Sequence, residues 1–475
     1  MKIFRIGCLF IPITIFYLSC TVPKAVQSTS IKPAPATFAN QTDSTNSALI
    51  QWHQFFNDTC LVALIDTALK NNVDIGIALQ NIEIAKSNVL IRKSALLPNI
   101  NIGGGAGVEK VGRYTSQGAG DASTEITPGK EVPDNLTDFN FSLQTSWELD
   151  VWGKLHTAKK AALAQYLATV EGKNFVVTNL VAEVANTYYE LLGLDNQLAI
   201  IKEAIQLQKN ELEVLKVQKE AAVVTELAVK QFEAQVYNAE SQAFEVQQNI
   251  TVAENKLNFL LGRYPQSITR ATANFMNQIP TLVNEGVPAQ LLNNRPDIRQ
   301  AALELKATQF ELQVAKLEFY PSVNITAALG LQAFKPRYLT KLPASVLYNF
   351  GTDVAAPIIN RNALKAAFST ANAVQIQAMY EYQKQILNGF VEVKNELSNI
   401  NNLQQQFEFK TKEVNTLTQS ITIASELFKY AKANYLEVLT VQRDAMAAKM
   451  ELIAVKKEQL KAVTNLYKAL GGGWQ

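Results

Sequence analysis

The sequence predicts an α+β protein made by tandem duplication, in which each copy contributes two β-strands and two very long helices. Two proline-free stretches, from Asp134 to Tyr264 and from Ile358 to the last residue, are rich in helix-forming residues. Short motifs also recur 223 residues apart, since Asp74 is echoed by Asp297 and Pro98 by Pro321 (297 − 74 and 321 − 98). A fixed offset of this kind is typical of an internal repeat.

The first copy is expected over residues 49–265, with a helical hairpin over about 152–262. Its apolar residues recur at steps of three and four, with one step of seven, which is the period of one helix face and close to a coiled-coil heptad. They are Val177, Leu180, Val184, Tyr188, Leu191, Leu194, Leu198, Ile201, Ile205, Leu212 and Leu215. A helix over about 154–221 would be roughly 100 Å long. The β-branched run Val223–Thr225 predicts the break between its two helices.

The second copy is expected over residues 288–475, with a helical hairpin over about 362–470 that breaks near Asn434. Residues 266–287 are interpreted as a linker, which the family resemblance described below would place in an equatorial region around the helices. In each copy a shorter helical unit precedes the strands, and in the first copy it runs from about Leu61 to Leu96.

Four segments alternate apolar and polar residues and predict strands over about 99–110, 139–150, 322–334 and 347–357. Strands of this length can span an outer membrane at a tilt. Soluble β-hairpins with one solvent-exposed face have the same alternating pattern. Four strands cannot close a barrel, and lipid tolerates no open sheet edge. If the strands cross a membrane, several chains must therefore contribute to one barrel, with two chains giving eight strands and three giving twelve.

The first 20 residues read as a secretion signal. Lys2 and Arg5 precede an apolar run that ends in Leu18-Ser19-Cys20, which resembles the lipobox of bacterial lipoproteins. We therefore expect a signal peptide over 1–19 and a lipid anchor on Cys20. Residues 20–48, rich in Ser, Thr, Pro and Ala, would form a flexible lipidated tether.

The composition offers no catalytic or cofactor chemistry. Besides Cys8 and Cys20 the only cysteine is Cys60, and the two histidines, His53 and His156, lie far apart in the sequence. No metal site and no cofactor are expected. A net charge of +2, spread along amphipathic helices, also argues against nucleic acid as a partner.

The order of elements behind a lipobox resembles the TolC-type outer-membrane efflux factors, in particular their lipoprotein branch. The motifs that carry the resemblance are Trp147-Glu148-Leu149-Asp150-Val151-Trp152-Gly153, Arg295-Pro296-Asp297-Ile298-Arg299, Tyr320-Pro321-Ser322-Val323 and Asn434-Tyr435-Leu436-Glu437. The resemblance implies a homotrimer with a twelve-stranded barrel in outer-membrane lipid and a twelve-helix tunnel in the periplasm. It implies a passive conduit, not an enzyme, that works with a periplasmic adaptor protein and an inner-membrane resistance-nodulation-division pump for drugs or other small toxic compounds.

Carried over by motif, the resemblance places a periplasmic gate at the turn of the second hairpin. Leu436 would be the apolar plug and Arg443 a pairing base, while Thr440 occupies the position where many relatives have an acid. Glu437, one turn earlier, or Asp444 could supply the missing charge. For Glu437 the alternative is a solvated residue in the first helical turn, favoured by the helix dipole. In the first hairpin, Thr225, Glu226 and Leu227 would dock the adaptor.

Two alternative functions stay open from the sequence. The chain could be the outer-membrane channel of an ATP-driven type I exporter, or a periplasmic coiled-coil scaffold without a pore. The transported substrate is not encoded in any motif.

Overall fold

The computed structural model describes residues 25, 35, 47–278, 286–358, 361–430 and 432–475. The expected lipid anchor, Cys20, and the expected signal peptide lie outside these residues. The described chain divides mainly into two compact units, one of residues 84–166 and 303–379 and the other of residues 47–83, 167–302 and 380–475. Each unit is described by itself.

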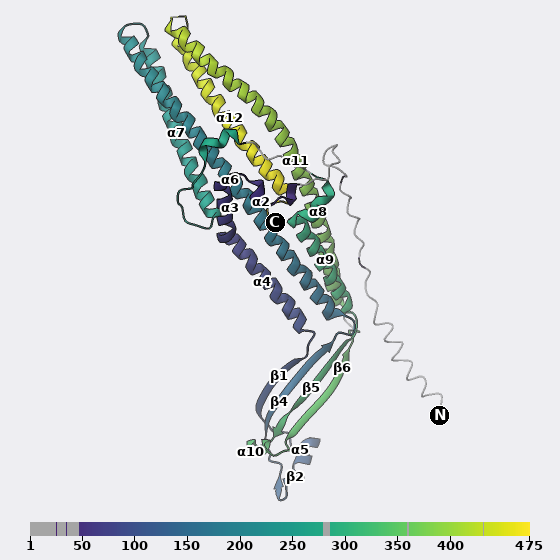
Figure 1. Ribbon diagram of the computed structural model, residues 1–475. Helices are drawn as coiled ribbons and strands as arrows, with labels where there is room; N and C mark the ends of the chain where they lie inside the picture. The colour runs from purple at the N-terminus through teal and green to yellow at the C-terminus, as the bar shows by residue number, and fades with distance from the viewer. Residues whose placement is uncertain (1–24, 26–34, 36–46, 279–285, 359–360, 431) are drawn as a thin grey trace. The chain divides into compact units, whose positions relative to one another are not determined.

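The first unit contains a four-stranded antiparallel sheet in the order β1-β4-β5-β6 (Figure 1). Its strands are β1 (Asn99–Glu109), β4 (Leu136–Leu149), β5 (Ser322–Ala333) and β6 (Val346–Ala355). Each predicted copy supplies two of the four strands, and the two copies meet where β4 pairs with β5. The outer strands, β1 and β6, form the two edges of the sheet.

The strand connections far from the helices carry short elements that the alternation pattern did not predict. Between β1 and β4 lie α5 (Ser116–Asp121) and a small hairpin of β2 (Glu125–Thr127) and β3 (Lys130–Glu131), and between β5 and β6 lies α10 (Pro336–Leu339). Their sequences, rich in Gly, Thr and Pro, have no apolar period long enough to reveal such short pieces.

Tryptophan side chains tie the helix-proximal ends of the strands to neighbouring backbone. The indole nitrogen of Trp152 donates to the carbonyl oxygen of Pro321 at 2.7 Å, and that of Trp147 donates to Leu96 at 3.1 Å. Asp150 accepts hydrogen bonds from the backbone amides of Leu155 and His156, which begin the long helix after β4. The geometry of this turn therefore comes from helix capping by Asp150 and from the two indole hydrogen bonds.

The helices flanking the strands have the lengths expected of the predicted hairpins. They are α6 (Lys154–Glu220), α7 (Glu226–Leu260), α11 (Asn362–Lys429) and α12 (Tyr435–Ala469). Shorter helices are η1 (Ser47–Leu49), α2 (Trp52–Phe55), α3 (Thr59–Asn71), α4 (Val73–Ser94), η2 (Thr272–Asn277), η3 (Pro288–Gln290), α8 (Leu291–Asn294) and α9 (Pro296–Leu317). The helical unit expected from Leu61 to Leu96 is thus two helices, because Asn72 adopts an extended backbone and caps α4 with its own side chain.

The core of the second unit is the apolar face that the heptad-like spacing predicted on α6. Val184, Leu191 and Ile201 are fully buried, as are Leu257 of α7 and Phe275 of η2. The cluster also includes Ile65 of α3 and Tyr467 of α12. Segments from both copies therefore share one hydrophobic core.

Both copies close the end of their long hairpin in the same way. Leu261 and Leu470 end α7 and α12, and each is followed by a glycine with positive φ, Gly262 at 65° and Gly471 at 95°. A Cβ atom at Gly262 would lie 2.2 Å from the backbone oxygen of Asn71. Only glycine permits both the left-handed conformation and this close approach.

Candidate functional site: the sheet face and the hairpin turns

One face of the four-stranded sheet is apolar and exposed. Ile102, Leu143, Leu329 and Tyr348 lie in register across all four strands, and residues paired in this way point to the same face. Ile102 is 70% exposed and Tyr348 is 80% exposed. The described chain places no helix over this row, so the face is available to an apolar environment outside the chain.

The opposite face of the sheet is polar. The row one residue along contains Asn101, Gln144, Ala328 and Asn349. Apolar residues on one face and polar residues on the other are the pattern of a strand that separates lipid from an aqueous lumen. In the described part of the chain, no helix combines the length and the apolar content needed to cross a membrane.

The turn of the first hairpin presents the side chains of Glu226 and Leu227 to solvent. Thr225 caps α7 by accepting a hydrogen bond from the amide of Ala228, so its side chain has a structural task. Glu226 pairs with Lys219 of α6, and this contact lowers the pKa of the Glu226 carboxyl. Leu227 is left as an exposed apolar side chain at the end of the hairpin.

The turn of the second hairpin ends in a similar cap. Asn434 accepts hydrogen bonds from the amides of Leu436 and Glu437, at 2.9 and 3.1 Å. The side-chain amide of Asn434 also contacts the Glu437 carboxylate at 3.3 Å. Glu437 therefore has the first-turn role that the alternative interpretation assigns to it, while its side chain remains exposed.

The four residues carried over as the gate lie on the outer side of α12. Leu436, Glu437 and Arg443 are exposed and Thr440 is half-buried. The guanidinium of Arg443 bonds to its neighbour Asp444 at 3.0 Å and not to Glu437. Within one chain, this face of α12 has no ion-paired lock between Glu437 and Arg443 among the described residues.

The inner side of α12 holds the two hairpin ends together. Tyr435 and Leu439 pack against a small apolar cluster from α6 and α7, together with Phe428 of α11. The buried members of the cluster are Leu212, Leu215, Val229, Phe232 and Val236. This packing leaves the opposite face of α12 free.

Polar bonds between α6 and α12 extend this contact along the hairpins. The side-chain amide of Gln442 donates to both carboxylate oxygens of Glu211, at 2.7 Å each. Burial raises the pKa of Glu211, and the hydrogen bond from Gln442 offsets part of that rise. Farther along, the Glu190 carboxylate accepts from Lys457 at 2.8 Å and from Lys461 at 3.1 Å.

Sequence reasoning missed these links because no local pattern marks them. Glu211 and Gln442 are 231 residues apart, and each by itself resembles an ordinary polar residue on a long helix. The signal that was available is position: Gln442 falls between the apolar residues Val438 and Ala445 on the buried side of α12.

The segment that follows α7 is held against the long helices by ion pairs and hydrogen bonds of charged side chains. Arg270 bonds to Asp195 of α6 at 2.9 Å and also to Glu254 of α7. The amine of Lys456, on α12, is buried and donates to the carbonyl oxygen of Gln278, and its burial lowers the pKa of Lys456. Among the described residues, no group of three or more His, Cys, Asp or Glu side chains is placed to hold a metal ion.

The family of the chain follows from comparison with known proteins. The model of the family described as outer membrane efflux protein matches residues 64–263 and 287–472. This chain belongs to the outer membrane efflux protein family. The two matched stretches overlap the two predicted copies, and the family consists of outer-membrane efflux channels, which are passive conduits.

Curated relatives in this family share more than a quarter of their residues with the chain. The pyoverdine export outer membrane protein OpmQ of Pseudomonas aeruginosa is 28% identical over 429 residues, which cover 90% of this chain and 88% of the relative. The toluene efflux pump outer membrane protein TtgF of Pseudomonas putida is 29% identical over 431 residues, covering 90% and 87%.

Solved structures confirm the predicted fold class. The CusC crystal structure aligns with a TM-score of 0.82 at 25% identity, covering 96% of this chain and 100% of that one. The open-state structure of the MtrE outer membrane channel of Neisseria gonorrhoeae aligns with a TM-score of 0.83 at 22% identity, covering 96% and 99%. The family match identifies the chain as an outer-membrane efflux channel protein, as predicted, and the solved structures agree with its fold.

Proposed function

We propose that three copies of this chain form a passive conduit that carries drugs or other small toxic compounds across the periplasm and the outer membrane. An inner-membrane resistance-nodulation-division pump supplies the energy, and a periplasmic adaptor protein joins pump and channel. The observation that carries the proposal is the sheet: it has one exposed apolar face, one polar face and two open edges.

The edges require more than one chain. In lipid the unpaired amides and carbonyls of β1 and β6 must find partners, which other copies of the same sheet supply. The strands run antiparallel from β1 to β6, so β6 of one copy can pair antiparallel with β1 of the next. Three copies give twelve strands, and the polar rows then face a lumen.

The long hairpins give the conduit its reach. α6 has 67 residues and α11 has 68. At 1.5 Å per residue each is roughly 100 Å long, a length that serves to bridge a periplasm and has no use in a compact soluble domain.

The gate is assigned to the outer side of α12, at Leu436, Glu437, Thr440 and Arg443. Leu436, Glu437 and Arg443 are left exposed by their own chain, and three copies of Glu437 around a threefold axis would repel one another and attract cations. The adaptor is assigned to the turn at Thr225, Glu226 and Leu227, where an exposed leucine adjoins a charged pair. Cys20 is assigned as the lipid anchor.

The experiment that tests the proposal is photo-crosslinking in living cells. A photoreactive amino acid replaces Leu227 in one strain and Leu436 in another, and mass spectrometry identifies what is captured. We expect adaptor at Leu227 and a second copy of the channel at Leu436. Capture of an ATP-driven exporter would move the function to type I secretion, and no capture of any inner-membrane or adaptor protein would favour a scaffold.

The gate is tested separately in planar lipid bilayers. Glu437→Gln is expected to reduce the cation selectivity of the conductance, because it removes three converging charges. The matched control is Glu408→Gln, which removes an exposed carboxylate on a different helix, α11, far from the turn. Equal selectivity in wild type and Glu437→Gln would exclude Glu437 from the gate.

A further inference from the structure

The connection between β5 and β6 carries charge of one sign only. From residue 319 to residue 352 the sequence contains no Asp or Glu, and its only basic residues are Lys335, Arg337 and Lys341. All three are exposed, and none takes part in an ion pair among the described residues. The connection between β1 and β4 is different, because residues 110–135 include three basic and four acidic residues.

The three cations surround a pair of aromatic rings. The ring centroids of Phe334 and Tyr338 are 5.1 Å apart. The guanidinium of Arg337 lies 4.8 Å from the ring centroid of Tyr338 and donates to its hydroxyl at 2.9 Å. The amine of Lys341 lies 5.1 Å from the same centroid, and the amine of Lys335 lies 5.8 Å from that of Phe334. These five side chains are called the α10 cluster.

The positive charges of the α10 cluster converge on one place. The hydrogen bond from Arg337, together with the charges of Arg337, Lys335 and Lys341, lowers the pKa of the Tyr338 hydroxyl. Contacts with aromatic rings position the cations but do not neutralise them, so the three like charges repel one another. An anion with several oxygen acceptors relieves this repulsion, and a phosphate group is such an anion.

Hydrogen bonds hold the backbone of the α10 cluster in place without a ligand. Ser345 is 5% exposed, and its hydroxyl donates to the backbone oxygens of Leu339 and Lys341, at 2.8 and 3.1 Å. The hydroxyl of Thr137, near the start of β4, donates to the backbone oxygen of Phe334. A site whose backbone is fixed before binding loses less conformational entropy when a ligand arrives.

The α10 cluster lies where the apolar face of the sheet ends. Because β5 follows α9 and β6 precedes α11, the connection that contains α10 joins the strand ends farthest from these helices (Figure 1). Leu331 and Val346 form the last pair of β5 and β6 and point to the apolar face. Leu342, 67% exposed, adds apolar surface beside Lys341. Cations and aromatic rings at the edge of an apolar belt are typical of the level of lipid head groups.

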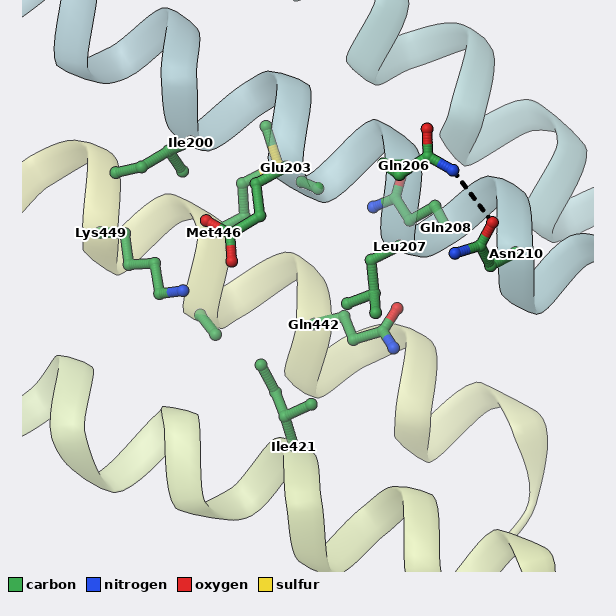
Figure 2. Close-up of a pocket in the computed structure, with 12 residues that line it drawn as sticks. Ile200, Glu203, Gln206, Leu207, Gln208, Asn210, Ile421, Gln442, Met446 and Lys449 are labelled. Carbon is green, nitrogen blue, oxygen red and sulfur yellow. Dashed lines mark hydrogen bonds between the residues drawn. The ribbon is translucent and has the colours of Figure 1, made fainter.

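The groove between α6, α11 and α12 has no comparable charge preference (Figure 2). Its lining contains one acidic residue, Glu203, and one basic residue, Lys449, beside apolar side chains such as Leu207 and Ile421. Opposite charges in equal number select neither a cation nor an anion. Charge therefore points to a ligand at the α10 cluster and not in this groove.

We propose that the α10 cluster binds the phosphate groups of lipid A, the phosphorylated glycolipid in the outer leaflet of outer membranes. The inference rests on the proposed function, because strands that cross the membrane from periplasmic helices place α10 at the outer surface. The guanidinium of Arg337 offers paired N–H donors to two phosphate oxygens, and Lys335 and Lys341 add point charges. Basic residues clustered at a membrane surface recognise anionic lipid head groups in this way.

The test is native mass spectrometry of the purified full-length protein in detergent, titrated with lipid A that carries two phosphates. Dephosphorylated lipid A has the same sugars and acyl chains, so it separates the role of phosphate from that of the apolar body. We expect the phosphorylated form to bind at least about 10-fold more tightly, the difference expected from charge-assisted hydrogen bonds. Equal binding of the two lipids would overturn the proposal. Inorganic phosphate that binds as tightly as lipid A would assign the α10 cluster to free phosphate instead of a lipid.

A triple variant locates the site. Lys335→Gln, Arg337→Gln and Lys341→Gln together are expected to weaken binding of phosphorylated lipid A about 10-fold and to leave that of the dephosphorylated form unchanged. The matched control replaces the exposed basic residues of the other connection, Lys110, Arg113 and Lys130, by glutamine and removes the same charge. It is expected to bind lipid A as the wild type does. An equal loss in both triple variants would show that total charge, and not the α10 cluster, attracts the lipid.

A single variant keeps the test valid if the triple variant does not fold. Arg337→Gln is expected to weaken binding of phosphorylated lipid A severalfold, and unchanged binding would overturn the proposal. The same spectra report how many chains assemble, which separates this inference from the conduit. Trimers that bind lipid A equally well with and without Arg337 would contradict the α10 site alone. Monomers whose lipid binding still depends on Arg337 would contradict the conduit and support the α10 site.

Discussion

The side-chain amide of Asn72 donates a 3.0 Å hydrogen bond to the backbone oxygen of Leu260, in the last turn of α7. The second copy has an equivalent hydrogen bond from a different side chain. The guanidinium of Arg295 donates at 2.8 Å to the backbone oxygen of Ala469, in the last turn of α12. In both copies, the residue that precedes the strand-leading helix fastens the end of the long hairpin. Helix C-termini have unpaired carbonyl groups, and each copy satisfies one of them from a distant segment.

The Arg295 connection is expected to be the stronger of the two. Arg295 is buried and also pairs with Asp297 and with Glu392, each at 2.7 Å. Arg295→Ala removes the ion pairs to Asp297 and Glu392 and the donor to the Ala469 carbonyl, and it should cost roughly 3 to 5 kcal/mol, against about 1 to 3 kcal/mol for Asn72→Ala. Thermal melting followed by circular dichroism measures both. Arg443→Ala, an exposed arginine, is the control and should change stability by less than about 0.5 kcal/mol.

Replacing Glu211 by glutamine is expected to stabilise the protein at neutral pH. Burial raises the pKa of Glu211, so the charged carboxylate weakens the folded state above that pKa, and stability recovers as the pH falls through it. Glu211→Gln removes the charge and keeps one side-chain oxygen that can accept from the amide of Gln442. The gain should be about 0.5 to 1.5 kcal/mol at pH 7 and should shrink in acid. A variant less stable than wild type at pH 7 would contradict this account.

Glu190→Gln is expected to have the opposite effect and the opposite pH dependence. Although burial alone raises its pKa, the hydrogen bonds and charges of Lys457 and Lys461 outweigh burial and hold the pKa of Glu190 below its usual value. The ionised Glu190 carboxylate therefore stabilises the folded state at any pH above its pKa in the unfolded chain. This stabilisation is lost as the pH falls through its lower pKa in the folded protein. Glu190→Gln should cost about 1 kcal/mol at pH 7, and the difference from wild type should vanish in strong acid. Melting curves between pH 7 and pH 3 test both statements.

Gly330→Ala is expected to disturb the sheet. A Cβ atom at Gly330 of β5 would lie 2.3 Å from the backbone oxygen of Phe141 and 2.5 Å from the Cβ of Ser142, both on β4. Neither atom can move without shifting the strand pairing, so folded protein in the outer-membrane fraction should fall severalfold. Gly107→Ala on β1 is the matched control, because no atom lies within 4 Å of the added Cβ. Equal amounts of both variants would show that β5 adapts.

The strands and long helices could be predicted because their apolar residues recur in the sequence with the period of a strand or of a helix. Val323, Ile325 and Leu329 alternate with polar or small residues along β5, and the buried leucines of α6 recur at three and four. The repeat was visible for the same reason, since Pro98 and Pro321 keep a constant offset.

What the sequence could not supply is the pairing of distant polar groups. Whether Glu211 meets a lysine, a glutamine or water depends on how α6 and α12 pack, and a period of 3.6 residues does not determine that register. The break at Asn72 was missed for a related reason: the apolar spacing continues across it, and the Asn72 side chain alone makes it a cap. Short elements such as α5 lie below the length at which any period can be read.

If the open edges of the sheet pair between chains, a mutation at one edge affects normal chains in the same ring. A chain that keeps a sound β1 edge but carries a damaged β6 edge can still accept a normal neighbour, yet it leaves the ring unclosed. In a cell that makes equal amounts of normal and damaged chains, only about one three-chain ring in eight is free of damaged chains, if chains mix at random and three copies close a ring. Such a damaged allele would be dominant, and one faulty copy would withdraw most of the normal protein from use.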